Sequence, residues 1–225
     1  SGQGAGKGEV VGGEGLDGGG ETARGGRMQG GLIREKVTAI SFPDYDQPSS
    51  ALVKMYLSGE FSSSVDGVNA YAASSFYAVD RYASYKKFWE SNYKSGDLIL
   101  ASRYVSSNII HQMVKLPHNE WDTYLDWLYD YEFVKLGLPI PNKVIFLDMP
   151  IEISQSLMTS RYNGDNTKKD IHEKDVEYLF NCREAALYAA DKLNWNIIKC
   201  SDGVNPYDID KINNEIIDVI FEVLN

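Results

Sequence analysis

The sequence predicts an α/β fold of three layers, in which a central, mostly parallel β-sheet is covered by helices on both faces. Short apolar runs, each about as long as one buried strand, alternate along the chain with longer segments of helical periodicity. Because parallel strands need long crossover connections, this alternation indicates βαβ units. The 225 residues show no internal repeat and are enough for one full core. We therefore expect a single domain over residues 1–225.

The expected strands are short apolar segments that end at a proline or a polar turn. Residues 36–42 are stopped by a proline, and residues 144–148 are followed closely by another. Residues 97–101 and 195–200 are further segments of the buried type. Residues 9–14 form the weakest expected strand because they include two adjacent glycines. Ligands bind beyond the carboxyl ends of such strands, so the residues that follow them are the candidates for a site.

The expected helices have apolar residues three and four positions apart. The two longest cover residues 68–93 and 120–135 and close at glycines, which commonly end helices. Shorter helices are expected at residues 49–57 and 151–160. Beyond a polar loop, one helix carries Val176, Leu179, Phe180, Arg183, Leu187, Ala190 and Leu193 on one side. The last helix has an apolar stripe of Ile209, Ile212, Ile216, Ile220 and Leu224.

Charge and composition exclude several classes of protein. A formal net charge of −10 argues against a general nucleic-acid surface, but it leaves open a site where a few basic groups meet a nucleotide. No apolar run approaches the roughly 20 residues that a membrane helix needs. Cys182 and Cys200 form no disulfide framework or zinc pattern. Residues 1–8, expected to be a disordered leader, contain no signal segment, so we expect a cytoplasmic protein.

Residues 15–22 match a phosphate-binding loop of the form G-x-x-x-x-G-K-[ST] in every position but one. Glycines such as Gly15, Gly18 and Gly20 let backbone N–H groups turn inward around phosphate oxygens. Thr22 would bind Mg²⁺ through its hydroxyl. Glu21 stands where a lysine should reach the phosphates, and it places a negative charge there. Taken alone, the segment is equally compatible with a flexible glycine-rich leader.

Three further segments combine aromatic and basic residues at positions suited to a nucleotide. Phe42-Pro43 directly follows an expected strand, although an ordinary proline turn also explains it. Tyr77 and Arg81 share one face of a helix, where a ring can stack on a base and a guanidinium can bond to its edge. A surface aromatic–arginine pair is the simpler alternative. Arg103 follows a strand end, where either a phosphate contact or a structural salt bridge is expected.

These segments, in this order, resemble the thymidylate kinase family. The family pattern E-G-x-D-G-x-G-K-S/T is matched by residues 14–22 apart from Glu21. The pattern F/Y-x-x-D/N-R is matched by residues 77–81, and D-R-Y-x-x-S-N by residues 103–108, with Ser102 in place of the aspartate. The resemblance covers about residues 9–225. It implies a P-loop kinase-type fold and a homodimer formed through packed helices.

The activity that the resemblance implies is phosphoryl transfer from ATP to dTMP, which gives ADP and dTDP for dTTP synthesis and requires Mg²⁺. Arg103 and Arg161 would be the catalytic residues. Arg103 would hold the dTMP phosphate, and Arg161 would belong to a lid at about residues 161–170 that closes over ATP. The residues implied at the ATP phosphates are Gly15, Gly18, Gly20, Glu21 and Thr22, with Thr22 also the metal ligand.

The resemblance also implies how dTMP is bound. Tyr77 would stack on thymine, Arg81 would bond to its edge, and Asp17 would accept a hydrogen bond from the 3′-hydroxyl of the deoxyribose. Ser107 and Asn108 would contact the base. The implied dTMP-binding residues are Asp17, Phe42, Tyr77, Arg81, Arg103, Ser107, Asn108 and His111.

Three departures from the family pattern leave two alternatives open. Glu21 removes the lysine, Ser102 removes a carboxylate used around the metal, and Asp44 stands where a basic residue is frequent. These changes favour a catalytically impaired homologue that only binds nucleotide as the first alternative. The second is a kinase for another nucleotide or for deoxynucleosides. The Phe-Pro turn and the Tyr77–Arg81 pair favour dTMP.

Overall fold

The computed structural model describes residues 8–15, 36–161 and 176–224. Within them, five strands form one sheet in the order β2-β3-β1-β4-β5, and every neighbouring pair is parallel. The strands are β1 (Val10–Gly15), β2 (Val37–Ser41), β3 (Leu98–Ser102), β4 (Lys143–Asp148) and β5 (Asn196–Lys199). The predicted parallel sheet is confirmed, and each strand lies close to its expected position.

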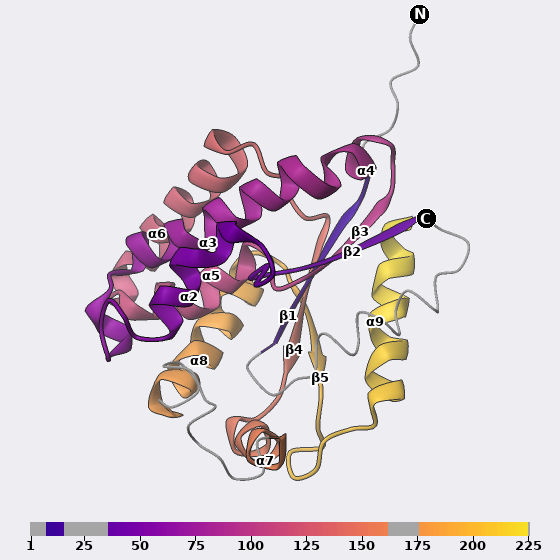
Figure 1. Cartoon of the computed structure of the whole chain (residues 1–225). Helices are drawn as coiled ribbons and strands as arrows, with labels where there is room; N and C mark the ends of the chain where they lie inside the picture. Colours follow the sequence, from indigo (N-terminus) through magenta and orange to yellow (C-terminus); the bar gives the residue numbers. More distant parts are fainter. Residues whose placement is uncertain (1–7, 16–35, 162–175, 225) are drawn as a thin grey trace, which may run out of the picture.

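Helices cover both faces of this sheet, as Figure 1 shows. One face carries α3 (Ala70–Ser84), α5 (Ser106–His111), α6 (Trp121–Tyr129) and α8 (Val176–Lys192), and the other carries α9 (Ile209–Leu224). The larger apolar core lies under the first group of helices, and a second core packs the strands against α9. The expected three layers are therefore present. No helix in the described ranges is long and apolar enough to cross a membrane.

Both long helices contain a π-helical segment that their periodicity does not predict. The helix expected over residues 68–93 is α3, a π-helical turn at Tyr85–Trp89 (η3) and α4 (Glu90–Lys94). The helix expected over 120–135 begins as α6 and ends in a π-helical segment, η6 (Asp130–Lys135). A π-helical turn shifts the register of the side chains that follow it. In η6 the buried residues are Glu132 and Phe133.

The shorter helices also lie where they are expected. Residues 49–57 form a 3₁₀ turn and α2 (Ala51–Leu57), and α7 spans Ile151–Arg161. For α8, however, the prediction of the apolar side is wrong in part, because Val176 and Phe180 are 42% and 45% exposed. The buried side also includes Cys182, Ala185, Ala186 and Ala189. Small side chains allow α8 to pack closely on α5, and a search for large apolar residues overlooks them.

The central strand is β1, although its two glycines make it the weakest expectation. It pairs with β3 on one side and with β4 on the other, so neighbouring strands stabilise a segment of low intrinsic propensity. Gly8, assigned above to a disordered leader, is instead ordered: its N–H donates to the carbonyl of Tyr93 at 2.7 Å. A Cβ at Gly8 would lie 2.2 Å from the carbonyl oxygen of Asp97, so only glycine fits there.

Candidate active site

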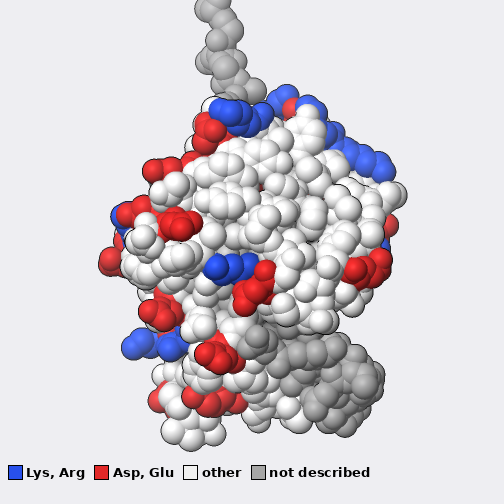
Figure 2. All heavy atoms as spheres, turned by 90° about the vertical axis from the view of Figure 1, so that its left-hand side faces the viewer, with Lys and Arg blue, Asp and Glu red and all other residues white. Residues whose placement is uncertain are grey.

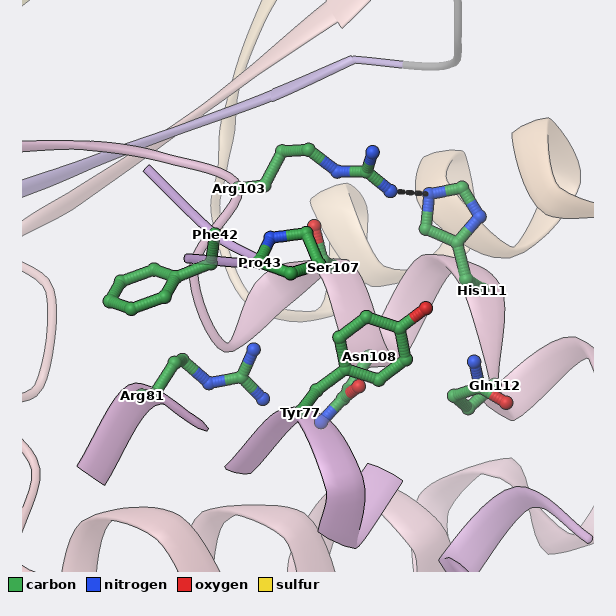
Figure 3. A pocket seen from close by; sticks show the side chains of 9 residues that line it. All are labelled: Phe42, Pro43, Tyr77, Arg81, Arg103, Ser107, Asn108, His111 and Gln112. Atoms are coloured by element: carbon green, nitrogen blue, oxygen red, sulfur yellow. Dashed lines mark hydrogen bonds between the residues drawn. The ribbon is translucent and has the colours of Figure 1, made fainter. Parts of the chain in front are cut away.

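A pocket lies beyond the carboxyl ends of β2 and β3, between the turn after β2, α3 and α5. The empty space between its walls, with the open solvent at its mouth included, is about 260 Å³. Its lining residues, shown in Figure 3, are Phe42, Pro43, Tyr77, Arg81, Arg103, Ser107, Asn108, His111 and Gln112. The structure thus brings together all the predicted dTMP-binding residues except Asp17, which lies outside the described residues.

Arg81 is fully buried and is held by a bidentate ion pair with Glu132, whose side chain is also buried. Nε of Arg81 donates to Oε1 at 2.7 Å, and Nη2 donates to Oε2 at 2.9 Å. Nη1 makes a longer contact of 3.5 Å with the carbonyl oxygen of Tyr104. A guanidinium has five N–H donors in one plane, so Nη1 and Nη2 each keep a donor beyond these contacts.

Asn108 is oriented by two acceptors. Its Nδ2 donates to the carbonyl oxygen of Ser74 and to Oε2 of Glu132, both at 3.2 Å. A carbonyl oxygen cannot face two acceptors, so these contacts fix which way the amide points. Both amide hydrogens are used, and Oδ1 is the atom that Asn108 can offer to a ligand. The pocket therefore combines donors from Arg81 with an acceptor from Asn108 (Figure 3).

Tyr77 forms another part of the pocket wall. Its ring is 8% exposed and packs edge-on against Tyr56, with the ring centroids 6.3 Å apart and an interplanar angle of 89°. Figure 3 shows Tyr77 and Arg81 extending from α3 into the same pocket, as their spacing predicts. An aromatic ring fixed by its edge can keep a face available for stacking.

Asp80, which precedes Arg81, fastens the turn after β2 to α3. Its Oδ2 accepts a hydrogen bond from the backbone N–H of Asp44 at 2.8 Å, and its Oδ1 accepts one from the hydroxyl of Ser49 at 2.6 Å. The turn contains the buried residues Phe42 and Pro43, which are joined by a cis peptide bond. Asp80 thus positions the part of the turn that lines the pocket.

Arg103 adopts a backbone conformation that is rare outside glycine, with φ of +61°. Its N–H donates to the carbonyl of Gly13 at 2.8 Å, which ties the end of β3 to β1. Its side chain is half-buried, and Nη2 lies 3.4 Å from Nε2 of His111. Such a conformation costs about 1–3 kcal/mol and occurs often at functional sites. Here it carries the guanidinium to the pocket.

His111 is buried and serves as an acceptor for Arg103. Burial, followed by the charges of Arg103 and Lys115, lowers the pKa of His111 well below its usual range. Because arginine is only a donor, Nε2 of the neutral ring accepts the hydrogen bond and the proton sits on Nδ1. Nδ1 lies 3.8 Å from Sγ of Cys182. These contacts fix the tautomer that orients Arg103.

Glu14, the last side chain before the predicted phosphate loop, is fully buried. Its carboxylate accepts hydrogen bonds from the N–H of Tyr104 at 2.6 Å and from the hydroxyls of Ser106 at 2.6 Å and Ser107 at 2.5 Å. Burial raises the pKa of Glu14, and these hydrogen bonds and the charge of Arg103 oppose the rise. Glu14 therefore connects the end of β1 to the segment that carries Arg103.

The edge beside this pocket belongs to β1 and β4, where Gly15 pairs with Leu147. Asp148, the next residue, forms a bidentate ion pair with Arg183 of α8, with N–O distances of 2.7 and 3.0 Å. Arg161 is the final residue of α7. The other residues predicted to bind ATP and Mg²⁺, namely Gly18, Gly20, Glu21 and Thr22, lie outside the described residues, as does most of the predicted lid.

Two buried acids of the site have roles that the sequence analysis does not predict. Glu14 is counted there only as one position of a motif, and Glu132 is not singled out at all. Glu132 lies four positions after Leu128 and seven after Leu125, both buried residues of the same helical segment. An acid in register with a buried apolar stripe indicates a partner in the interior, because an unpaired carboxylate is too costly to bury. That spacing is the signal that could have identified Glu132.

Comparison with known proteins identifies the family. The family model described as thymidylate kinase matches residues 14–208 of the chain. The chain belongs to the thymidylate kinase family. This assignment makes it a kinase, with phosphoryl transfer to a nucleoside monophosphate as its chemistry.

Two sequence relatives agree with the assignment, and a solved structure shows the same fold. The thymidylate kinase of Mycobacterium tuberculosis (strain H37Rv) is 27% identical over 180 residues, which cover 78% of this chain and 82% of the relative. The probable thymidylate kinase 1 of Saccharolobus solfataricus is 29% identical over 104 residues, covering 46% of this chain and 50% of the relative. The solved structure of thymidylate kinase from Candida albicans, at 19% identity, has the same fold: its TM-score is 0.70, with 96% of this chain and 92% of that chain covered.

Proposed function

We propose that the protein binds dTMP in the pocket and transfers a phosphoryl group to it from ATP, giving dTDP and ADP for dTTP synthesis. The observation that carries this proposal is the pairing of Arg81 donors with the Oδ1 acceptor of Asn108 at one pocket. Thymine presents O4, an acceptor, next to N3–H, a donor. Cytosine presents an N4 amino group, a donor, in place of O4. The arrangement of hydrogen-bond donors and acceptors in the pocket thus favours thymine or uracil over cytosine.

The remaining pocket residues fit the other parts of dTMP. Tyr77 provides a ring for stacking on the base, an interaction worth about 1–3 kcal/mol in nucleic-acid systems. Arg103 provides a fork of donors for the phosphate, and Asp17 is proposed to accept from the 3′-hydroxyl of the deoxyribose. Phosphoryl transfer depends mostly on positioning and on stabilisation of charge. Arg103 would supply both, and Arg161 would add positive charge from the lid at about residues 161–170.

ATP would bind at the carboxyl end of β1, where Gly15 begins the predicted phosphate loop. Gly18 and Gly20 would turn backbone N–H groups toward its phosphates. Mg²⁺ fits here as a companion of ATP, since it usually keeps several waters and is held by phosphates and one or two protein oxygens. Thr22 is the proposed protein ligand. The described residues contain no cluster of three acidic, histidine or cysteine side chains that would form a separate metal cage.

Glu21 favours a second candidate, a homologue that binds dTMP but turns it over poorly. Two like charges about 4 Å apart repel by about 4 kcal/mol at an effective dielectric constant of 20, and the missing lysine forfeits a similar attraction. Glu21 is assigned to the loop at the ATP phosphates, whereas the described residues proposed to bind dTMP come from other segments, so dTMP affinity is expected to survive.

The experiment that tests the proposal measures binding and turnover separately on the chain and on Glu21→Lys, with genes verified by sequencing. Calorimetry with dTMP, dUMP, dCMP and dGMP ranks the acceptors, and a coupled assay with ATP and Mg²⁺ measures turnover. We expect dTMP to bind most tightly to both proteins. A preference for dCMP or a purine nucleotide would contradict the assignment of dTMP, and fast turnover by the Glu21 form would contradict the proposed phosphate loop.

We propose that two copies of the chain associate through the side of the molecule that carries α3. The only charged residues of α3 are Asp80 and Arg81, and both are buried. Its exposed positions include Val79 and Tyr82, each 40% exposed. Figure 2 shows few charged side chains over the centre of this side. In a chain with a net charge of −10, an uncharged face is where two copies repel each other least.

Sedimentation velocity tests this association. The chain is expected to sediment as a dimer and Val79→Glu as a monomer. Val204→Glu is the matched control, because Val204 is 77% exposed and lies in the loop between β5 and α9. If the wild type sediments as a monomer, the proposed dimer is refuted. We place the dimer in the cytoplasm, in keeping with the two buried free thiols, Cys182 and Cys200.

A further inference from the structure

Glu132 contacts two residues that are proposed to read the base, yet it does not line the pocket itself. Its carboxylate accepts two hydrogen bonds from Arg81, and its Oε2 also accepts from Nδ2 of Asn108. Arg81 comes from α3, Asn108 from α5 and Glu132 from η6, so three separate elements meet at one carboxylate. All three side chains are buried.

We propose that Glu132 is a positioning residue that sets the base preference of the pocket, an inference that rests on the proposed function. A carboxylate is only an acceptor, so each neighbour must turn a donor toward it. Arg81 has donors alone and satisfies this condition in any orientation. Asn108 satisfies it only by turning Nδ2 toward Glu132, and the carbonyl oxygen of Ser74 accepts from the same Nδ2, which leaves Oδ1 for the ligand. Glu132 therefore fixes the donors of Arg81 and shares with Ser74 the orientation of the Asn108 amide.

A neutral amide at position 132 would break this arrangement. Both carboxylate oxygens accept from Arg81, so the NH₂ group of a glutamine faces an arginine donor whichever way the amide turns. Arg81 has no acceptor to offer in return, so it keeps at most one of its two hydrogen bonds and its guanidinium is no longer fixed. Where the NH₂ group takes the place of Oε2, Asn108 loses an acceptor as well. The donors proposed to meet O4 of thymine would then no longer be held in place, and the pocket would distinguish O4 of thymine from the N4 amino group of cytosine less well.

Stability alone does not account for this arrangement. A buried ion pair seldom stabilises a protein more than well-packed apolar residues of similar volume would. Glu132 also lies in η6, and π-helical segments are frequent at functional sites. A contribution to orientation explains why the carboxylate reaches Arg81 and Asn108 together, whereas a purely structural ion pair would need only Arg81.

The test compares Glu132→Gln with the wild type by calorimetric titration of dTMP and dCMP into the full chain. We expect the variant to bind dTMP at least tenfold more weakly and to lose at least tenfold in its preference for dTMP over dCMP. ATP affinity, measured in parallel, should change less than twofold. Asp122→Asn is the matched control: Asp122 lies in the first turn of the same helical segment but pairs at the surface with Lys192, at 2.8 Å. Its dTMP and dCMP affinities should equal those of the wild type.

Weaker binding of both nucleotides by the same factor would overturn the proposal, because loss of a structural support does not change discrimination. An unchanged preference would overturn it as well. If Glu132→Gln does not fold, as judged by its thermal transition, Glu132→Asp replaces it: the shorter carboxylate cannot span Arg81 and Asn108, and the same loss of preference is expected. The wild-type titration tests the proposed function separately, because a wild type that does not prefer dTMP refutes dTMP recognition before any variant is compared.

Discussion

The pocket proposed to bind dTMP (the acceptor pocket) and the neighbouring end of β1 proposed to bind ATP (the donor edge) differ in how their charged residues are balanced. In the pocket, charged groups meet partners of opposite charge or complementary hydrogen-bonding character: Arg81 meets Glu132, Arg103 meets His111, and Glu14 meets three donors. At the donor edge, the predicted phosphate loop carries Glu21 where phosphates would bind. One region satisfies its charges before any ligand arrives, and the other would bring like charges together.

This difference separates binding from turnover. A preorganised pocket loses little free energy in ordering its side chains when a ligand binds. A carboxylate among phosphates would raise the free energy of bound ATP and still more that of the transition state, where a lysine normally stabilises charge. The comparison therefore predicts that changes at the donor edge alter turnover, whereas changes in the pocket alter recognition of dTMP.

The largest expected effect is that of Glu21→Lys. Removing the repulsion and restoring the attraction, each about 4 kcal/mol as an upper bound, should raise turnover and ATP affinity by several orders of magnitude. Affinity for dTMP should change little, because residue 21 is assigned to the ATP phosphates and not to dTMP. Steady-state kinetics and dTMP calorimetry on both proteins measure the two effects.

Glu21→Gln is the control for charge. It removes the repulsion without adding the lysine, so it should fall between the other two proteins. Equal turnover of all three proteins would contradict the proposed donor site and would remove the contrast between the two regions.

Arg103→Ala should lower kcat/KM for dTMP about 10²-fold, on the order of 3 kcal/mol. The measurement is made in the Glu21→Lys background, where turnover is expected to be fast. The half-buried position of Arg103 at the end of β3 favours a role in the site over one in the core, so the melting temperature should change little. Arg103→Lys keeps the positive charge but cannot donate two parallel hydrogen bonds to the phosphate, so it should recover only part of the lost kcat/KM. Near wild-type kinetics of Arg103→Ala would exclude Arg103 from the site.

Much of the acceptor pocket was predictable because its residues sit in short segments of distinctive composition. Phe42, Tyr77, Arg81 and Arg103 come from turns, helix faces and strand ends whose geometry follows from local sequence, and the parallel sheet then brings these segments to one edge. The sheet itself followed from the alternation of short apolar runs and longer helical segments.

The partners of these residues could not be predicted in the same way. Glu132 pairs with Arg81 across 51 positions, and Glu14 reaches Ser107 across 93. Such contacts depend on tertiary packing. The spacing of Glu132 from the buried Leu125 and Leu128 indicates that its side chain faces the interior, but it does not indicate which residue the carboxylate meets there. For α8, the buried side was misjudged because alanines and Cys182 provide close packing without high hydrophobicity.

Tyr77→Ala should weaken the binding of dTMP by about 1–3 kcal/mol and leave ATP affinity nearly unchanged. The reason is loss of the stacking surface on the acceptor side alone. Tyr77→Phe is the matched variant, since it keeps the ring, and its dTMP affinity should remain within about threefold of the wild type. Calorimetry with each nucleotide measures both. Equal losses for dTMP and ATP would mean that Tyr77 supports the fold, through its contact with Tyr56, more than it reads the base.

The smallest expected effect concerns proton binding at His111. Because the pKa of His111 is well below its usual range in the folded protein, the unfolded chain binds this proton at pH values where the folded chain does not. Stability from this residue is therefore fully present above pH of about 6.5 and falls as the pH decreases, by at most about 1.4 kcal/mol per pH unit. His111→Gln keeps an acceptor for Arg103 but binds no proton.

Urea unfolding of the wild type and His111→Gln at pH 7.5, 6.5 and 5.5 measures this contribution. The difference in unfolding free energy between the two proteins should shift by about 1 kcal/mol in favour of the variant between pH 6.5 and 5.5. The raised pKa of Glu14 acts in the opposite direction in both proteins and cancels in the difference. If the difference in unfolding free energy between the wild type and His111→Gln does not depend on pH, the folded protein binds a proton at His111 as readily as the unfolded chain does. His111 would then not be held in its neutral form, as its contacts imply.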